Sequence, residues 1–575
     1  MSIRSVHSVL RVAAPIVVGV HYAFGQSPLP IPPVLSGAQI SLTLQEGAWE
    51  FHPGETVSTY GYNGDLLGPT IVLERGQEVT LNVTNTLPDL TTTHWHGLHV
   101  SPENDGGPHS LILPNTTWSP SFTVLDRAST YWYHPHGHGL TDYQVSMGAA
   151  GMIIVHDESE AALPLPRMYG VDDVPLIIQA KSIMDGQIML HTGLDSVITV
   201  NGVARPVGQL PAQVVRFRCL NGASERTFLL GFTGDRPFHV IGTDGGLLDE
   251  PVQRTRLRLM PGERAELLVD LSGMEGSDFQ LIAFNSELPN GIIGSPQVGN
   301  GMATLDGYDD NALNGADHAI VRFDVTEPTA DAILAIPSTL LPLALLDASA
   351  ATVVRTFNIA PQGTAPMEMI EGPFTMNDAL MDMDVINETV ELGATEIWVF
   401  ENNSMVGHPI HIHDVQFNIL ERNGSTPEDW ERGWKDVVYV PAMGSARVIM
   451  RFEDFADPEM PYMYHCHLLM HEDEGMMGQF LVVDPNGVNE NTSASGPLLL
   501  WPNPWVAGDL WLDAQDDELA SALITDATGR EVLQVRVPVG SKRWNIHLPE
   551  LAPGVYNLTT TGYHPRKAKL LIAAP

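Results

Sequence analysis

Residues 70–83 read TIVLERGQEVTLNV and contain two short runs, 70–74 and 78–83, in which apolar and polar side chains alternate. Successive side chains of a strand point to opposite faces, so this alternation predicts strands with one buried face. Similar runs recur along the chain between Gly, Pro and Asn turns, whereas stretches with a helical period are scarce. The sequence therefore predicts an all-β protein built from β-sandwiches.

A weak internal repeat divides the chain. A β-rich pattern that ends in Asn occurs at 68–85, 200–221 and 375–402, which indicates three related β units. Loop composition predicts a first β unit at 27–158, a second at 165–327 and a third at 353–485. A separate C-terminal module, predicted as a small β-sandwich, occupies 497–575.

The charge of the chain narrows the possible partners. The 575 residues include 69 acidic and 29 basic side chains, which gives a formal net charge of −40. Nucleic acids and anionic membranes need a basic face, so both are disfavoured. Residues 497–575 hold eight acids and seven bases, a net of −1, so the acidic excess belongs to the three β units.

The N-terminus predicts export. Residues 1–25 combine two arginines with an apolar run at 12–20 and end in Ala23-Phe24-Gly25, a pattern typical of a secretory signal peptide. A membrane anchor is disfavoured because the run contains Pro15 and is shorter than the roughly 20 residues that span a bilayer. We expect no membrane span and a protein that is secreted or held at the cell surface, or alternatively periplasmic.

Ten of the 22 histidines fall into four short clusters. They are HWH at 94–96, HPH at 134–136, HPIHIH at 408–413, and HCH at 465–467 followed by His471. Alternate residues of a strand share a face, so each His-x-His can offer two imidazoles to a metal. Four such pairs supply more imidazoles than one ion can use. The pattern therefore indicates several metal ions held between the first and third units.

Cys466 lies between His465 and His467 and so faces the other side of their strand. Two imidazoles, a thiolate and a weakly bound thioether form the blue-copper ligand set. The side chains left for that set are His408, Cys466, His471 and Met476. A zinc hydrolase needs only three ligands and an open position, and a di-iron site prefers carboxylates on helices, so neither explains the pattern.

The other cysteine, Cys219, lies in the alternating stretch 214–220. Such a position predicts a buried thiol that behaves as a small apolar side chain. We therefore expect no disulfide in this chain.

The motifs HWHG, YHPHGHG, HPIHIH and HCHLLMHEDEGM resemble, in order and spacing, the copper motifs of three-domain bacterial multicopper oxidases, the group of copper-efflux oxidases, bilirubin oxidases and laccases. The resemblance covers residues 40–485 and implies three cupredoxin-like Greek-key sandwiches with four copper ions. The implied type 1 ligands are His408, Cys466, His471 and Met476. The implied type 2 ligands are His94 and His411. The implied type 3 ligands are His96, His134 and His467 on one ion, and His136, His413 and His465 on the other.

The resemblance also implies a reaction. The type 1 copper would accept single electrons from a reducing substrate, and the other three ions would reduce dioxygen to two waters. Glu472 and Asp105 resemble carboxylates that deliver protons and orient imidazoles or water in this family. The alternative for each is a solvated loop carboxylate.

The sequence says less about the reducing substrate. Thioethers suit Cu(I), and several methionines precede the third-unit strands, but methionine also fills cores. These are Met367, Met369, Met376, Met381 and Met383. The long Met-rich insert of copper-efflux oxidases is absent, and Ser404 stands where those enzymes carry an acidic residue. We expect a phenol or aromatic amine, with cuprous or ferrous ion as the alternative. A copper-free structural or binding protein is the alternative from another class.

The C-terminal module resembles the sorting domain of the type IX secretion system. Residues 502–504 read PNP, residues 526–530 read DATGR, and residues 554–556 read GVY, as in that domain. The resemblance implies secretion machinery as a partner and removal of the module on export. The alternative is an ordinary accessory β domain.

Overall fold

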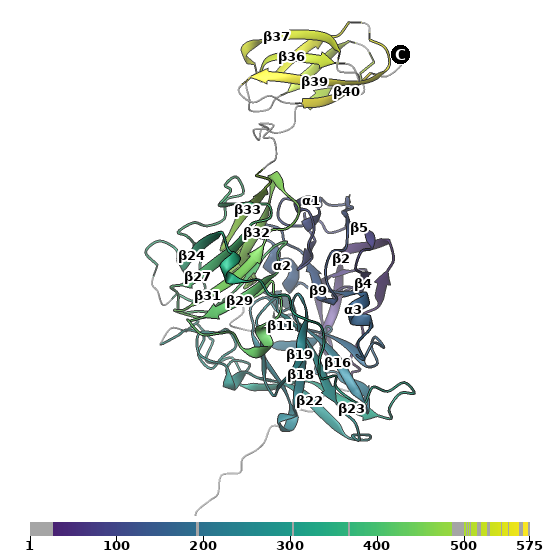
Figure 1. Cartoon of the computed structure of the whole chain (residues 1–575), viewed down its shortest axis with the longest axis vertical. Helices are drawn as coiled ribbons and strands as arrows, with labels where there is room; N and C mark the ends of the chain where they lie inside the picture. Colours follow the sequence, from purple (N-terminus) through teal and green to yellow (C-terminus); the bar gives the residue numbers. More distant parts are fainter. Residues whose placement is uncertain are drawn as a thin grey trace, which may run out of the picture. The chain divides into compact units, whose positions relative to one another are not determined.

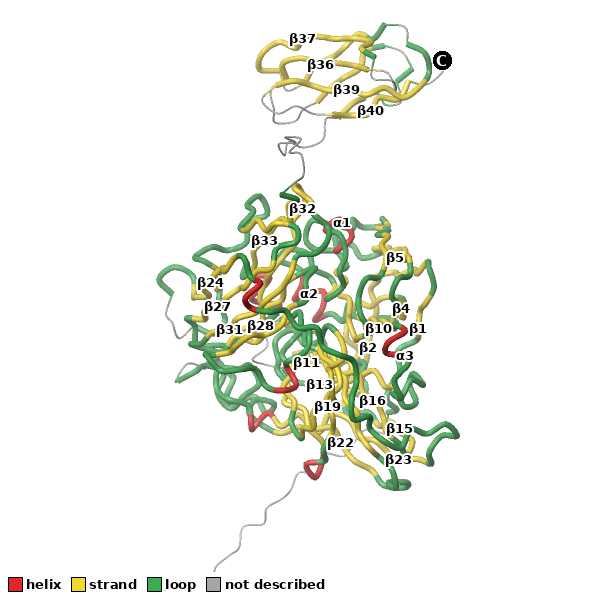
Figure 2. Tube along the Cα trace, in the orientation of Figure 1, coloured by secondary structure: helices red, strands yellow, loops and turns green. Residues whose placement is uncertain are grey.

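The computed structural model describes residues 27–190, 195–301, 304–365 and 369–485, and residues 499–572 apart from 502, 504, 507, 514–518, 526–529, 542, 550 and 563–566. The predicted signal peptide and Met367 lie outside the described residues. Strands dominate the described chain and its helices are few and short (Figure 2), so the all-β prediction is confirmed. No helix among the described residues is long and apolar enough to cross a membrane.

The chain forms two compact bodies, one up to Val483 and one from Asp484 onward. Within the described residues, the first body contains six sheets and the second contains two. The exact domain boundaries given above stay predictions.

The first β unit has two sheets, and the stretch 70–83 joins them. It supplies β4 to one sheet and β5 to the other through a turn in which Gly76 has a φ of 84°. Alternate side chains of β5 are buried, as the sequence predicts. One sheet has the order β1 (Val34–Ser36), β4 (Thr70–Glu74), β10 (Gly151–His156), β9 (Ser129–His134), β6 (His94–His96). The other has β3 (Glu55–Tyr62), β2 (Gln39–His52), β5 (Glu78–Asn85), β7 (Thr117–Trp118), with β8 (Ser121–Thr123) on β5.

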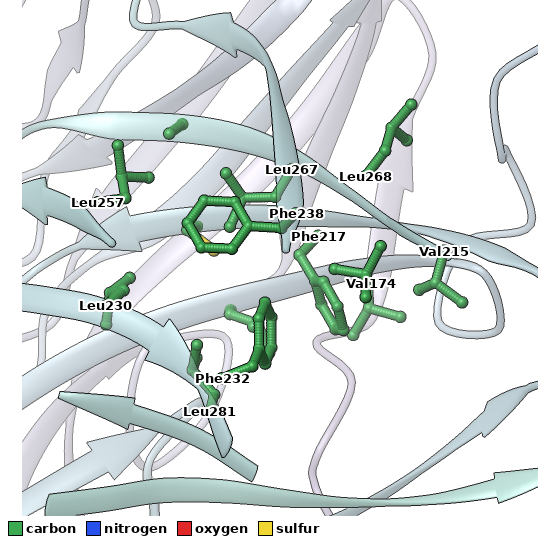
Figure 3. Close-up of a cluster of buried hydrophobic side chains, with 14 of the residues drawn as sticks. Val174, Val215, Phe217, Leu230, Phe232, Phe238, Leu257, Leu267, Leu268 and Leu281 are labelled. Atoms are coloured by element: carbon green, nitrogen blue, oxygen red, sulfur yellow. The ribbon is translucent and has the colours of Figure 1, made fainter. Parts of the chain in front are cut away.

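The second β unit also has two sheets. The larger has the order β14 (Val203–Ala204), β13 (Val197–Val200), β11 (Asp173–Met184), β16 (Val214–Asn221), β21 (Arg264–Asp270), β18 (Phe238–Thr243), β19 (Gly246–Arg254), with β12 (Gln187–Met189) on β11. The smaller has β15 (Val207–Pro211), β23 (Asp317–Thr326), β22 (Asp278–Phe284), β17 (Phe228–Phe232), β20 (Leu257–Leu259). Aromatic side chains from both sheets, among them Phe217, Phe232 and Phe238, meet in its core (Figure 3).

The third β unit repeats the plan of the first, with two five-stranded sheets. One has the order β25 (Phe374–Met376), β24 (Val353–Pro361), β27 (Thr395–Asn402), β31 (Ser445–Arg451), β29 (Phe417–Arg422). The other has β26 (Glu388–Glu391), β33 (Met477–Val483), β32 (Asp457–Cys466), β28 (His408–Ile412), β30 (Val437–Val440). The α-helices of the first body are α1 (Pro102–Asp105), α2 (Thr141–Ser146), α3 (Glu158–Ala161) and α4 (Leu469–Asp473).

The C-terminal body has a three-stranded and a four-stranded sheet, and Figure 1 labels the strands of the latter. The first has the order β34 (Leu499–Trp501), β35 (Asp509–Asp513), β38 (Arg543–His547). The second has β37 (Glu531–Ser541), β36 (Leu519–Thr525), β39 (Gly554–Gly562), β40 (Lys567–Ile572). Its own apolar side chains, including Leu512, Ile524 and Leu558, build its core.

Candidate metal centre

Two strand pairs, one in the first unit and one in the third, carry most of the predicted ligands. In the first unit, β6 pairs with β9 so that His94 lies opposite His134. In the third unit, β28 pairs with β32 so that His411 lies opposite His465. All twelve predicted side chains are buried. Eight imidazoles form what we call the histidine cluster: His94, His96, His134, His136, His411, His413, His465 and His467.

Three nitrogens of the histidine cluster face one point. The Nε2 atoms of His136, His413 and His465 lie 3.1 to 3.3 Å from one another. Nδ1 of His413 bonds a carboxylate oxygen of Asp105, Nδ1 of His465 bonds the carbonyl of Cys466, and Nδ1 of His136 lies 3.3 Å from Oε1 of Glu472. These neighbours favour the tautomer in which each Nε2 carries a lone pair. Ligands about 2.0–2.1 Å from a metal in tetrahedral directions lie about 3.3 Å apart. This spacing suits one metal ion.

A second set consists of His96, His134 and His467, whose ligand atoms lie within 4.8 Å of one another. The Nδ1 atom of His134 bonds the carbonyl of Pro135 at 2.8 Å, so its Nε2 is free to bind, and that atom lies 3.5 Å from Nδ1 of His96. Both ring nitrogens of His467 are buried without a hydrogen-bond partner. Buried polar atoms are rarely left unpaired in proteins, so this set also points to a metal ion.

His94 and His411 form the remaining pair of the histidine cluster. Each donates from Nδ1 to a backbone carbonyl, that of Asp105 at 2.9 Å and that of Asp436 at 2.8 Å. Each Nε2 is buried and unpaired. With His96, the two imidazoles place their ligand atoms within 4.8 Å of one another, so this pair too has the donor set of a metal site.

We call a second set of side chains the cysteine group: His408, Cys466, His471 and Met476. Cys466 faces the side of β32 opposite to its neighbour His465. The Sγ of Cys466 lies 3.5 Å from Nδ1 of His408 and 3.8 Å from Nδ1 of His471. The far nitrogen of each imidazole is already bonded, to the hydroxyl of Ser404 at 2.9 Å and to the carbonyl of Ile370 at 3.2 Å. Thiolate sulfur with two imidazole Nδ1 atoms suits a soft metal such as copper.

Met476 is the fourth member of the cysteine group. Its side chain is fully buried in the same apolar core that contains Cys466. Its carbonyl accepts a hydrogen bond from the amide of Cys466 at 3.0 Å, and its amide donates to the carbonyl of His471 at 2.8 Å. These two backbone hydrogen bonds therefore hold Met476 beside Cys466 and His471.

Burial lowers the pKa of several of these imidazoles. It lowers the pKa of His134 to about 3 and that of His471 to about 4, against an ordinary value of 6.5. The pKa values of His136, His408 and His411 are also lowered well below 6.5, first by burial and then by neighbouring imidazoles. A neutral imidazole is the form that binds a metal, so the site is ready for ligation at neutral pH.

The two predicted carboxylates lie against the histidine cluster rather than in solvent. Glu472 places Oε1 3.3 Å from Nδ1 of His136 and Oε2 3.1 Å from Nδ1 of His465. Asp105 places Oδ2 2.8 Å from Nδ1 of His413 and Oδ1 3.3 Å from Nδ1 of His94. Both side chains are buried, so the structure does not make them solvated loop carboxylates.

The neighbouring imidazoles also set the charge of Glu472. Burial alone would raise its pKa, but His136 and His465 lower the pKa to about 2. An ionised carboxylate that accepts from Nδ1 fixes the tautomer in which Nε2 faces a metal.

Asp436 is a functional residue that sequence reasoning missed. Its Oδ1 lies 3.1 Å from Nε2 of His96, and its carbonyl accepts the Nδ1 proton of His411. It lies in the stretch GWKDVV (433–438), within the 40–485 range over which the sequence resembles multicopper oxidases, but outside the four histidine motifs. Its carboxylate lies beside Nε2 of His96, which explains why this ring turns Nδ1 toward His134.

Similarity to known proteins extends over most of this chain. Two family models described as multicopper oxidase match residues 43–160 and 352–486. A multicopper oxidase of Staphylococcus haemolyticus is 30% identical over 77% of this chain and 88% of its own length. A cell division protein, FtsP of Xenorhabdus nematophila, is 32% identical over 80% of this chain and 93% of its own length.

Solved structures give the same picture. The CueO laccase-like multi-copper oxidase of Ochrobactrum sp. is 33% identical, covers 79% of this chain and all of its own, and has a TM-score of 0.70. The McoA multicopper oxidase of Aquifex aeolicus is 30% identical, covers 80% of this chain and all of its own, and has a TM-score of 0.69. A Campylobacter jejuni multicopper oxidase called a metallo-oxidase is 26% identical over 80% of this chain and 96% of its own, with a TM-score of 0.67.

Proposed function

Because this chain belongs to the multicopper oxidase family, we propose that it is a laccase-like oxidase that couples four one-electron oxidations of a phenol or aromatic amine to the reduction of dioxygen to two waters. The observation that carries the proposal is the complete donor set, in which the Nε2 atoms of His136, His413 and His465 converge to within 3.1 to 3.3 Å of one another.

The proposed ligand assignment follows the groups described above. The cysteine group would hold a type 1 copper, and His94 with His411 a type 2 copper. Two sets would hold the type 3 pair, namely His96, His134 and His467, and His136, His413 and His465. When bound, the four copper ions would supply one-electron redox chemistry and the site of dioxygen reduction.

Glu472 and Asp105 are the proposed proton-handling residues. Each carboxylate touches two imidazoles of the histidine cluster through Nδ1. Each can therefore hold an imidazole in the ligand tautomer and pass a proton toward water formed beside the cluster. Removing one such partner costs about 10–100-fold in metal affinity or activity.

The surroundings of the cysteine group favour an organic reductant. The hydroxyl of the buried Ser404 lies 2.9 Å from Nε2 of His408, and among the described residues no acidic side chain is bonded to this nitrogen to receive a cuprous ion. Met376, one of the methionines considered for Cu(I), is buried in the third-unit core. Cuprous or ferrous oxidation stays the second candidate, and it is favoured by the similarity to the Campylobacter jejuni enzyme, which is called a metallo-oxidase.

A structural or binding role is the candidate from another class. The cell-division name of FtsP supports it, since that relative is as similar to this chain as the named oxidases. The complete donor set argues against it.

Export is a further part of the proposal. Residues 1–25 would act as the signal peptide, and the C-terminal body would act as the type IX sorting domain that engages secretion machinery. The enzyme would then be secreted or held at the cell surface, or alternatively periplasmic. Mass spectrometry of the exported protein tests this, because a chain that still begins at residue 1 or ends at residue 575 contradicts it.

Oxygen consumption by one copper-loaded preparation tests the function. We expect dimethoxyphenol to be oxidised faster than Cu(I) or Fe(II), with one dioxygen consumed per four electrons and no hydrogen peroxide released. Faster oxidation of Cu(I) or Fe(II) would show that the substrate is a metal ion rather than a phenol. If none of the three compounds is oxidised, the oxidase proposal is wrong.

A further inference from the structure

The second β unit supplies none of the twelve proposed ligands, yet it forms part of the wall around the histidine cluster. Gly262 precedes β21 with a φ of 83°, and a Cβ placed there would lie 2.9 Å from Cδ2 of His467. Two residues further on, the side chain of Arg264 is fully buried. A cationic side chain from the unit without ligands therefore lies within the metal centre.

Every N–H group of the Arg264 guanidinium has a partner. Nη1 and Nη2 each bond one carboxylate oxygen of Asp436 at 2.6 Å. The three remaining donors bond backbone carbonyls of Thr130, Gly262 and Asp244 at 3.0 to 3.1 Å. The five bonds reach all three β units. Lysine has only three donors and no planar fork, so it could not make this set.

Asp436 links this guanidinium to two proposed ligands. Its Oδ1, held by Nη1 of Arg264, lies 3.1 Å from Nε2 of His96. Its carbonyl holds Nδ1 of His411. His96 is also the imidazole that turns Nδ1 toward the cluster, where it lies 3.5 Å from Nε2 of His134. The carboxylate position thus decides which nitrogen of His96 is free to bind a metal.

We propose that Arg264 is a positioning residue for the metal centre: by fixing Asp436 it holds His96 and His411 in the orientation that binds the type 2 copper and the neighbouring type 3 copper. This inference rests on the proposed function. It makes the second unit a determinant of copper binding, although that unit supplies none of the proposed ligands.

A purely structural role for Arg264 is the competing explanation, and Arg218 provides a matched control. Arg218 is also buried in the second unit and bonds both oxygens of Asp173, at 2.8 and 2.9 Å. It also reaches the first unit, at Thr130, and bonds Glu266. No imidazole is among these partners. Arg218→Lys therefore removes a comparable buried fork without touching the centre.

The experiment compares the wild-type protein with Arg264→Lys and Arg218→Lys after copper loading of the full chain. Copper per chain is measured by elemental analysis, and the type 1 and type 2 signals are measured by electron paramagnetic resonance. For Arg264→Lys we expect an unchanged type 1 signal, with either loss of about half or more of the type 2 signal or a changed type 2 hyperfine splitting. For Arg218→Lys we expect both signals to match the wild type.

An unchanged type 2 signal in Arg264→Lys overturns the inference, as does an equal loss in Arg218→Lys. If Arg264→Lys does not fold, Asp436→Asn takes its place, since it keeps the shape of the side chain but not the paired carboxylate. The same loss is then expected, and a wild-type spectrum overturns the inference. A wild-type protein that binds no copper would instead remove the proposed function.

Discussion

At the scale of single residues, hydrogen bonds decide which ring nitrogen each imidazole offers. His413 offers Nε2 because Asp105 holds its Nδ1, whereas His96 offers Nδ1 because Asp436 holds its Nε2. Burial then keeps the rings neutral, because it disfavours the charged form. The carboxylates around the imidazoles therefore determine which ring nitrogens are available to bind a metal.

The two cysteines differ in role. Cys466 lies within reach of two imidazoles, whereas Cys219 is buried in the second-unit core. We expect Cys466→Ser to remove the blue absorption and abolish oxidation. Cys219→Ala should keep both and cost on the order of 1 kcal/mol in the free energy of unfolding. Absorption spectra and denaturant unfolding check this, and equal effects of the two changes would contradict it.

His99 provides a prediction for pH. Burial alone would lower its pKa, but the carboxylate of Asp126, 2.7 Å from its Nδ1, raises the pKa to about 9 from an ordinary 6.5. A group whose pKa is raised on folding stabilises fully below its unfolded pKa and loses this effect as pH rises through the folded value. The destabilisation caused by His99→Gln should therefore be largest below pH 6.5 and shrink through pH 9. A stability difference that does not change with pH would refute this.

Which single residues the sequence could predict follows from the same physics. Alternation along a strand predicts that His465 and His467 share a face and that Cys466 does not, without any tertiary information. The role of Asp436 could not be predicted, because it depends on Arg264, which lies 172 residues away in the chain. A local sequence pattern does not predict a contact between residues so far apart in the chain.

At the scale of elements, strand register brings the ligands together. His94 lies opposite His134 and His411 opposite His465, so each strand pair delivers imidazoles from two motifs. The alternating runs predict that β6 and β28 are extended, but they do not predict these partners, because register is fixed by turns and by the packing of the whole sandwich.

The residue that follows the short helix α1 must be a glycine. Gly106 caps the helix with a φ of 81°, and a Cβ there would collide with the carbonyl of Thr93. Gly54 has almost the same φ, 82°, but no atom within 4 Å of such a Cβ. Gly106→Ala should therefore cost clearly more than the about 1–2 kcal/mol expected for Gly54→Ala.

Unfolding in urea measures both changes. Because Asp105 precedes Gly106, we also expect Gly106→Ala to reduce copper content, and Gly54→Ala to leave it unchanged. Equal unfolding free energies for the two variants would show that the collision is relieved at no cost.

At the scale of the whole molecule, the first and third β units supply the histidine cluster, and Arg264 of the second unit bonds residues of both. The charge of −40 lies almost entirely on these units, and a negative surface favours neutral or cationic reductants over anionic ones. The C-terminal body has its own core, so its apolar side chains are buried without the oxidase.

Removal of the C-terminal body tests this independence. A chain that ends at residue 485 should bind copper and oxidise dimethoxyphenol at the rate of the full chain, since every proposed ligand lies before that point. Activity measured on equal copper-loaded amounts checks it. A large loss of rate, with the shortened chain still folded, would mean that the C-terminal body contributes to the oxidase.

Copper content and the absorption and resonance spectra of the copper-loaded full chain decide whether the proposed copper sites exist. We expect about four coppers per chain, a blue absorption band from the cysteine group and a type 2 resonance signal beside the type 1 signal. Fewer than about three coppers per chain, or a preparation without the blue band, would contradict it.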